Sequence, residues 1–493
     1  MEQVPLSLPA AILPSVSGVL SAGCTSQFVR VQPNNQSTIV SAESGELSAS
    51  TTVPTIVSFP AVPLEFTIPS GSSKNVFIDT SKSTLQFRVK YEVSTASTAN
   101  YTIVSYLQNS ACSWFERLTE KVNGMVTDDQ VGWDVACNSD LNWAYDAVNR
   151  DSNVLNMGFR GEQTALDNAN FNQGHQIPII TKTTAGAIST GSNYFSYAIP
   201  LKSAMIGVDA KSMFPIGRAG KVDLTLYTPN TAPITVLSTA AGGTGAKVKI
   251  TMDQVFIELF YLTLDDQSAS LLPSPSSPWS MTGVTHRVGN GQLPAAGGSV
   301  SVQVPLRVKS ARSLSTRFVD STVDTTGSVS GKYDSKCPLV TAMSYYLAGQ
   351  KRVPNVPHST QYGLANVFNH TMQAYYDGGM DRLKSKCGFA QDGFATYIKT
   401  DTAPTAANGF DQSLITAGST TYAGSLCGFE FAEDLRLAST SNFLNGTDLT
   451  SSNSYLEINQ SASYPKNIQY LTFIAKADII YIVLPNGNVE VRV

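Results

Sequence analysis

The sequence predicts an all-β protein built from two consecutive β-sandwiches. Apolar and polar residues alternate with a period of two in most patterned segments, and helical periodicity is scarce. A stretch rich in proline and serine divides the chain of 493 residues into two blocks of about 200 residues each. A block of that length suits a β-sandwich with long loops.

Each alternating segment predicts a strand with one buried face. The clearest segments are 85–93, 222–226, 248–252, 300–308 and 479–484. The last of them is followed by Pro485, by Asn486-Gly487 and by a further alternating run to the C-terminus. Because asparagine and glycine both tolerate positive φ, this dipeptide between two strands predicts a β-hairpin.

Helices are expected only as short connections between strands. Trp114, Leu118 and Val122 have helical spacing and predict a helix over 113–122. A second short helix is predicted over 141–148.

Composition shifts divide the chain into an extended N-terminal arm (1–59), a first sandwich (60–266), a linker (267–279) and a second sandwich (280–493). The arm contains one basic residue, Arg30, and is rich in serine, proline and valine. It therefore lacks the charge of a nucleic-acid-binding arm.

The overall charge argues against a nucleic-acid-binding protein. Thirty-three Lys and Arg against 37 Asp and Glu give a net charge of −4, and only 14% of residues are charged. Phosphate binding needs clustered positive charge, so no specific nucleic-acid binding is expected. Small basic clusters at 307–317 and 382–386 are interpreted as intersubunit pairs or solvated faces.

No motif predicts catalysis, a cofactor or a metal. The four histidines have no metal-ligand spacing, 242–247 lacks the Gly-Lys-Ser/Thr of a phosphate loop, and no G-x-S-x-G elbow occurs. Asp128-Asp129 and Asp265-Asp266 are interpreted as solvated turn acids. The six cysteines are widely spread without a C-x-x-C pair, which favours free thiols over disulfides.

Four segments resemble the major capsid proteins of double jelly-roll icosahedral DNA viruses, the lineage of adenoviruses, virophages and polinton-like viruses. They are 113–129, 197–229, 301–320 and 464–493. The first carries a turn at Asn123-Gly124, the second an "IPL…G…PIG" stretch before an alternating strand, and the last an "AKADIIYIV" run before the closing hairpin. The long N-terminal arm departs from the family pattern.

The resemblance implies a double jelly roll, two eight-stranded jelly-roll β-sandwiches side by side, with short helices in long loops. It implies a capsid protein without catalysis, whose homotrimers have a nearly hexagonal outline and tile an icosahedral virion shell. The implied partners are neighbouring capsomers, a penton protein and minor or cement proteins, with an internal membrane left open. The implied location is the virion, assembled inside the host cell.

Two aromatic clusters in long insertions are candidate contact anchors between subunits. They are Trp114, Phe115, Trp133 and Trp143 in the first block, and Tyr345, Tyr346, Tyr375 and Tyr376 in the second. The alternative interpretation is local core beneath a loop.

Two other functions stay open at this point. One is the coat protein of a small RNA virus with shell and protruding domains, which the missing basic arm disfavours. The other is a secreted β-sandwich adhesin or carbohydrate-binding protein, including a glycosidase, because a carboxylate pair can come from distant parts of a chain. That function predicts disulfides or glycans.

Overall fold

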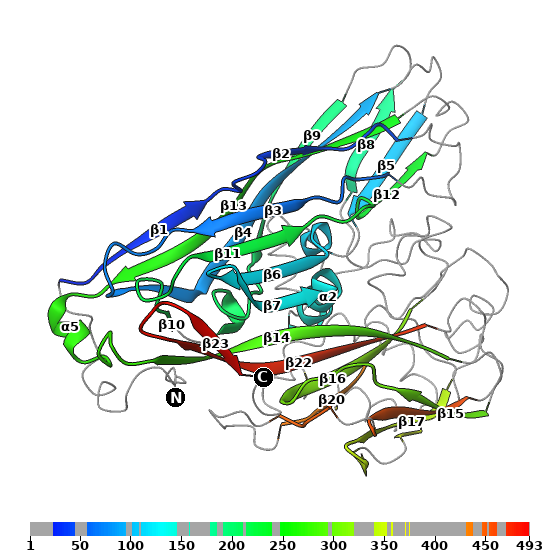
Figure 1. Ribbon diagram of the computed structural model, residues 1–493. Helices are drawn as coiled ribbons and strands as arrows, with labels where there is room; N and C mark the ends of the chain where they lie inside the picture. The colour runs from blue at the N-terminus through cyan, green and yellow to red at the C-terminus, as the bar shows by residue number, and fades with distance from the viewer. Residues whose placement is uncertain are drawn as a thin grey trace.

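The structure is a computed structural model that consists mainly of antiparallel β-sheets (Figure 1). It describes residues 23–44, 57–94, 101–107, 110–144, 157, 178–184, 191–210, 213–238, 247–293, 298–319, 340–352, 356–357, 370, 374, 430–436, 446–450, 453–460 and 470–492. In this part of the chain no helix is both long and apolar enough to cross a membrane.

The first sandwich consists of a six-stranded and a four-stranded sheet. In the larger sheet the order is β1-β13-β4-β10, with β2 also on β13 and β9 also on β4. In the smaller sheet the order is β3-β11-β6-β7. The bounds are β1 Thr25–Val31, β2 Thr38–Val40, β3 Pro63–Ile68, β4 Val76–Ser94, β6 Arg117–Val122, β7 Met125–Val131, β9 Gly191–Pro200, β10 Met213–Phe214, β11 Val222–Tyr227 and β13 Lys247–Thr263.

The second sandwich has two five-stranded sheets. One has the order β14-β22-β16-β20 with β23 on β22, and the other has the order β15-β21-β17-β18 with β19 on β17. The bounds are β14 Trp279–Gln292, β15 Gly298–Gln303, β16 Ala311–Val319, β17 Val340–Leu347, β18 Gln350–Lys351, β19 Val356–Pro357, β20 Glu430–Asp434, β21 Tyr455–Gln460, β22 Tyr470–Val483 and β23 Val489–Arg492.

The two sandwiches repeat one topology. Strands β1, β13, β4 and β9 of the first have the order of β14, β22, β16 and β20 in the second. Strands β3, β11, β6 and β7 likewise correspond to β15, β21, β17 and β18. Because the eight strands of each set also follow one another in the same chain order, each sandwich is an eight-stranded jelly roll. The predicted fold class is confirmed.

A further three-stranded sheet extends the first jelly roll. Its order is β12-β5-β8, with β5 Tyr101–Leu107, β8 Pro178–Thr184 and β12 Ile234–Ser238. Each strand comes from a different connection between strands of the first roll, so three long loops are joined into one element (Figure 1).

The predicted helix over 113–122 is wrong. The structure has a 3-10 helix, η2 Ala111–Trp114, followed directly by strand β6. Leu118 and Val122, four residues apart, also lie on one face of a strand, and pairing with β7 and β11 fixes the extended form. The other predicted helix starts earlier than expected, because α2 covers Trp133–Ala144.

The predicted strands and hairpins are present. Segments 85–93, 222–226 and 248–252 lie in β4, β11 and β13, and 479–483 lies in β22. Gly487 has φ of 83° in the β22–β23 hairpin, and Asn123 and Gly124 have φ of 51° and 79° between β6 and β7. The predicted strand over 300–308 is shorter, because β15 ends at Gln303, although burial still alternates up to Ser310.

The ends of the predicted domains differ in detail from the elements. Within the predicted arm 1–59, strands β1 and β2 pair with β13, so the sheet of the first roll starts before residue 60. The predicted linker 267–279 begins inside a short helix, α5 Asp266–Ser270, and ends at the first residue of β14.

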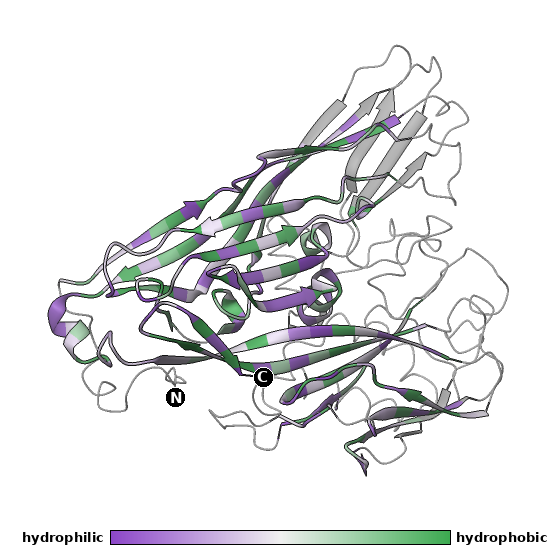
Figure 2. Cartoon of the chain, in the orientation of Figure 1, coloured by the Kyte–Doolittle hydropathy of each residue, from purple (hydrophilic) through white to green (hydrophobic). Residues whose placement is uncertain are grey.

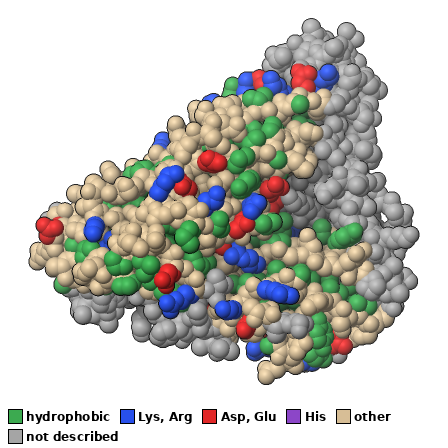
Figure 3. All heavy atoms as spheres, viewed as in Figure 1, with side chains coloured by type: hydrophobic (Ala, Val, Ile, Leu, Met, Phe, Trp, Pro, Cys, Tyr) green, Lys and Arg blue, Asp and Glu red, His purple; other side chains and the backbone are tan. Residues whose placement is uncertain are grey.

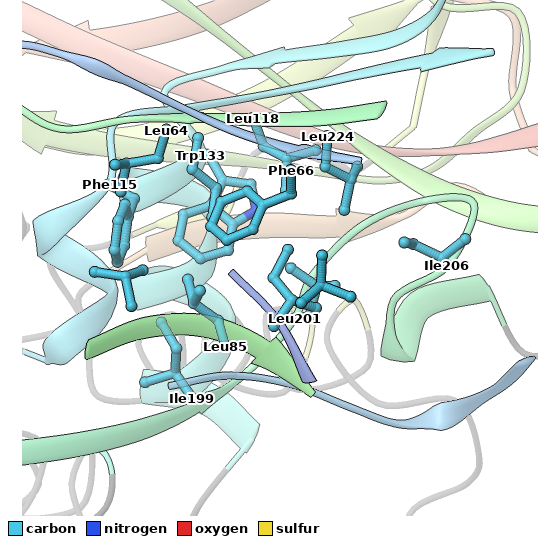
Figure 4. Close-up of a cluster of buried hydrophobic side chains, with 14 of the residues drawn as sticks. Leu64, Phe66, Leu85, Phe115, Leu118, Trp133, Ile199, Leu201, Ile206 and Leu224 are labelled. Carbon is cyan, nitrogen blue, oxygen red and sulfur yellow. The ribbon is translucent and has the colours of Figure 1, made fainter. Parts of the chain in front are cut away.

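The first roll has an apolar core between its two sheets. Leu64, Phe66, Leu118 and Leu224 project into it from the smaller sheet and pack around Trp133 of α2 (Figure 4). Hydropathy alternates along many of the strands coloured in Figure 2, so that these strands present one apolar face. The same cluster continues into the second roll. Its members there are Trp279, Met281, Ile479, Tyr481, Val483 and Val489.

Candidate functional site at the contact between the jelly rolls

The contact between the two jelly rolls holds the densest group of buried polar side chains that bridge the two. Strands β14 and β22 lie below β7 and α2 in Figure 1, where residues far apart in sequence meet. In the described part of the chain no three His, Cys, Asp or Glu side chains could hold one metal ion. The side chains at this contact are joined by hydrogen bonds and ion pairs.

Asp128 of β7 is the centre of the first group of contacts. Its buried carboxylate accepts hydrogen bonds from Thr285 Oγ1 at 2.8 Å and from Arg287 Nη2 at 2.6 Å, both on β14. Arg287 Nη1 also donates to the backbone oxygen of Asp129 at 2.9 Å. Strands β7 and β14 are both edge strands, so these contacts join the edge of one roll to the edge of the other.

Glu120 lies directly opposite Asp128 in the ladder between β6 and β7 and is also fully buried. It accepts hydrogen bonds from Ser203 Oγ, from the backbone N–H of Met205 at 3.3 Å and from Tyr481 Oη of β22 at 3.1 Å. Burial, together with the neighbouring charge of Asp128, raises the pKa of Glu120 to about 7.

Asp140 of α2 is the centre of the second group. It pairs with Lys202 of its own roll and with Lys476 of β22 in the other roll. Burial opposes the ionisation of Asp140, but the two ammonium groups outweigh it and hold its pKa well below the ordinary value. Burial likewise opposes the charge of Lys202, whose pKa is nevertheless raised by Asp140 and by Asp209, 3.7 Å away.

His286 of β14 is buried beside this second group. Burial lowers its pKa to about 4, so the imidazole is neutral near neutral pH. The nearby Asp209 and Asp140 act in the opposite direction without overcoming the burial. Among the described residues neither ring nitrogen has a hydrogen-bond partner.

The C-terminal hairpin of the second roll forms a third contact. Asn123, in the turn between β6 and β7, donates from Nδ2 to Oδ1 of Asn488 at 2.6 Å. The backbone N–H of Gly220 donates to the oxygen of Gly487 at 2.7 Å. A Cβ at Gly220 would lie 2.2 Å from Oδ1 of Asn123, so a larger residue there would displace the Asn123 side chain from its bond to Asn488.

Backbone also approaches backbone closely at Gly283 of β14. A Cβ there would lie 1.9 Å from the carbonyl oxygen of Ala204. The loop 201–207 therefore rests directly on β14, and a side chain would separate the two rolls.

Together these groups can hold two rolls at a fixed angle, because the carboxylates of one roll are bound by donors of the other. Such pairs add little over a well-packed apolar contact, but removing one partner leaves an uncompensated buried charge. The arrangement therefore resists partial separation of the rolls.

The predicted aromatic anchors of the first block lie inside the chain. Trp114, Phe115 and Trp133 have no exposed surface. Trp114 packs edge-to-face on Phe59, and Phe115 packs edge-to-face on both Phe87 and Trp133. They contribute to the core of the monomer. The side chain of Trp143 lies outside the described residues.

The predicted aromatic residues of the second block are divided. Tyr345 is fully buried, stacked on Phe431 at 4.7 Å. Tyr346 is half-buried and stacks on Tyr455 of β21, also at 4.7 Å, with Lys351 over its ring. Tyr375 and Tyr376 lie outside the described residues.

Sequence reasoning missed the polar residues of the contact. Asp128 was expected to be a solvated turn acid and is instead buried, as is Arg317 of the predicted basic cluster. Asp265 does cap a turn, accepting from the N–H of Ser268 at the start of α5. The sequence of β7 carries no alternation that points to Asp128, because its apolar residues are exposed and its buried residues are polar.

The described cysteines and the surface fit the sequence analysis. Cys24, Cys112 and Cys137 are free thiols, and the other three cysteines lie outside the described residues. On the face shown in Figure 3, Lys and Arg side chains are interspersed with Asp and Glu among uncharged polar surface. This face has no continuous basic patch.

No family model matches the sequence, and no curated protein matches it. Among solved structures, the chain is similar to one in the 3.5 Å electron cryomicroscopy structure of the Sputnik virophage. The TM-score is 0.50 and the identity 10%, covering 94% of this chain and 90% of that one.

The chain is also similar to the mavirus major capsid protein, with a TM-score of 0.49, 9% identity and coverage of 100% and 96%. For the Faustovirus major capsid protein the TM-score is 0.46 and the identity 10%, covering 96% of this chain and 94% of that one. The likeness to the Sputnik chain, with the repeated strand order, shows that this chain has the double jelly-roll fold that the sequence resemblance implied.

Proposed function

We propose that this protein is a major capsid protein of a DNA virus, which forms pseudo-hexagonal homotrimers that tile an icosahedral virion shell and which performs no catalysis. The observation that carries the proposal is the union of two jelly rolls of the same strand order into one block. A shared apolar core and buried ion pairs hold this block together.

The geometry of a shell explains why such a block is useful. Three copies of a chain with two similar rolls place six rolls around one axis, and closed rings of this kind need identical contacts between copies. Neighbouring rings fit together only if every ring has the same outline. Buried contacts between the rolls, including the close approach at Gly283, support a constant angle within each copy.

The proposed partners follow from the same role. They are two further copies in the trimer, neighbouring trimers, a penton protein at the vertices and minor or cement proteins between trimers. A net charge of −4 gives the chain little attraction to nucleic acid, so no specific nucleic-acid contact is part of the proposal. Its place would be the capsid of the virion.

The proposal is tested by the mass and shape of the purified full-length protein. Light scattering after size-exclusion chromatography should give three times the chain mass of 52.6 kDa, and negative-stain images should show six-sided particles. A monomer at micromolar concentration would contradict the proposal. An intact mass that changes on reduction or that includes glycans would favour a secreted β-sandwich protein, and particles containing RNA would favour an RNA-virus coat.

A further inference from the structure

The repeated topology allows the contact inside the chain to be compared with surfaces that remain open. Inside the chain, edge strand β7 of the first roll meets edge strand β14 of the second. The counterpart of β14 in the first roll is β1, and the counterpart of β7 in the second roll is β18. Strands β1 and β18 are also edge strands of their sheets among the described strands.

The counterpart of the buried edge is open to solvent. Residues Gly283 to His286 of β14 are all buried, whereas Thr25 to Phe28 of β1 are all exposed. Phe28 keeps 59% of its surface exposed although it is a large apolar residue. An exposed aromatic residue on an open sheet edge is a surface that soluble proteins ordinarily cover or protect.

The counterpart of the β6–β7 hairpin is open as well. Ala348 and Gly349 form the turn between β17 and β18 with φ of 52° and 77°, close to the values of Asn123 and Gly124 in the first roll. Residues 348–352 are all exposed. The β6–β7 hairpin contacts β14, β22 and the β22–β23 turn of the second roll, so the same element contacts the other roll in one case and is exposed in the other.

We propose that β1 of one copy packs against the β17–β18 hairpin of a second copy, as β14 packs against the β6–β7 hairpin within the chain. The inference rests on the proposed self-assembly. A ring of alternating first and second rolls has two kinds of contact, one inside each copy and one between copies. The internal contact uses β7 and β14, which leaves β18 and β1 for the contact between copies.

Each surface carries an aromatic side chain among exposed polar and charged residues. The ring of Phe28 packs edge-to-face on that of Phe260, with the centroids 4.9 Å apart. Lys82 Nζ lies 3.8 Å from the centroid of the Phe260 ring. On the hairpin side, Tyr346 is stacked on its neighbour Tyr455 and is half-buried. Aromatic residues held in place by their neighbours lose little entropy on binding and are frequent anchors of interfaces.

The test uses an exposed aromatic residue on each end of the larger sheet of the first roll. Phe28→Asp places a charge on β1, and Tyr194→Asp places the same charge on β9, where Tyr194 is 51% exposed. Light scattering over a dilution series should show that Phe28→Asp weakens association by about thirtyfold or more. Tyr194→Asp should associate like the unchanged protein.

A second variant keeps the test decisive if Phe28→Asp does not fold. Ala348→Asp places a charge at the tip of the β17–β18 hairpin, where aspartate tolerates the positive φ, and it should also weaken association. Circular dichroism establishes that each variant is folded. Trimers that persist in both variants would overturn this inference while leaving the proposed function intact. An unchanged protein that stays monomeric would overturn both.

Discussion

Strands β1 and β14 open two jelly rolls of the same topology, yet their surroundings are opposite. Strand β14 is covered by the first roll and carries Gly283, Thr285 and Arg287 where that roll approaches. Strand β1 carries Phe28 and Arg30 on a surface open to solvent. Shared topology therefore does not dictate which edge is covered. The side chains on each edge determine which edge is covered, and substitutions of these side chains test the difference.

The largest effect is expected at Gly283, where a single methyl group would reach backbone. In Gly283→Ala the new Cβ would lie 1.9 Å from the oxygen of Ala204, so β14 and the loop 201–207 must move apart. Overpacking against backbone should lower the free energy of unfolding by about 3 kcal/mol. Urea unfolding followed by circular dichroism measures the loss.

The matched control is Ser280→Ala in the same strand, because Ser280 is exposed. Surface substitutions of this type change stability by less than about 0.5 kcal/mol. If Gly283→Ala were as stable as Ser280→Ala, the two rolls would not be held in direct backbone contact.

The next prediction compares Arg287 of β14 with Arg30 of β1, the first strands of the two rolls. Arg287→Gln removes the cation bound to the fully buried carboxylate of Asp128 and should cost about 2 to 3 kcal/mol, since a buried charge loses its partner. Arg30→Gln removes an ion pair with Glu258 in which the arginine side chain is 64% exposed, and should cost less than about 1 kcal/mol.

Urea unfolding of both variants at pH 7 gives the two values. A double variant with Asp128→Asn separates the pair from other effects, because Arg287→Gln should cost less when Asp128 is already neutral. Equal losses for Arg287→Gln and Arg30→Gln would mean that the covered edge stabilises the protein no more than the open one.

These residues also show how far the sequence could predict the structure. The strands follow from alternation, as in β11, where Val222, Leu224 and Leu226 are all fully buried. Two hairpins follow from Asn-Gly pairs, because asparagine and glycine tolerate the positive φ that Asn123, Gly124 and Gly487 adopt. These signals are local, so they can be recognised in the sequence without knowledge of the tertiary contacts.

The candidate site could not be predicted in the same way, because its partners are distant in sequence. Glu120 occupies a core-facing position of β6, and the Tyr481 hydroxyl that binds it lies 361 residues later. Hydropathy alone assigns an acid to the surface. The sequence does not distinguish core from interface at Trp114 and Phe115, which are fully buried, because an aromatic cluster has the same composition in both.

The smallest effect is the pH dependence contributed by Glu120. Its pKa of about 7 in the folded protein exceeds the ordinary value, so the folded state binds this proton more tightly than the unfolded chain does. Its contribution to stability is therefore largest below the ordinary pKa and falls as pH rises towards 7. Glu120→Gln removes this dependence, so the variant should gain about 1.5 kcal/mol relative to the unchanged protein between pH 5.5 and 7.

His286 supplies the matched control with the opposite sign. Burial lowers its pKa to about 4, so its neutral form favours folding at high pH, and that contribution is lost as pH falls below about 6.5. His286→Asn should therefore gain stability, relative to the unchanged protein, towards pH 5.5. In the unchanged protein, Glu120 and His286 contribute opposite pH dependences to the free energy of unfolding. Urea unfolding of each variant must therefore be compared with the unchanged protein at each pH. A difference between Glu120→Gln and the unchanged protein that stays constant from pH 5.5 to 7 would show that Glu120 is ionised throughout, and that the contact between the rolls binds a full negative charge there.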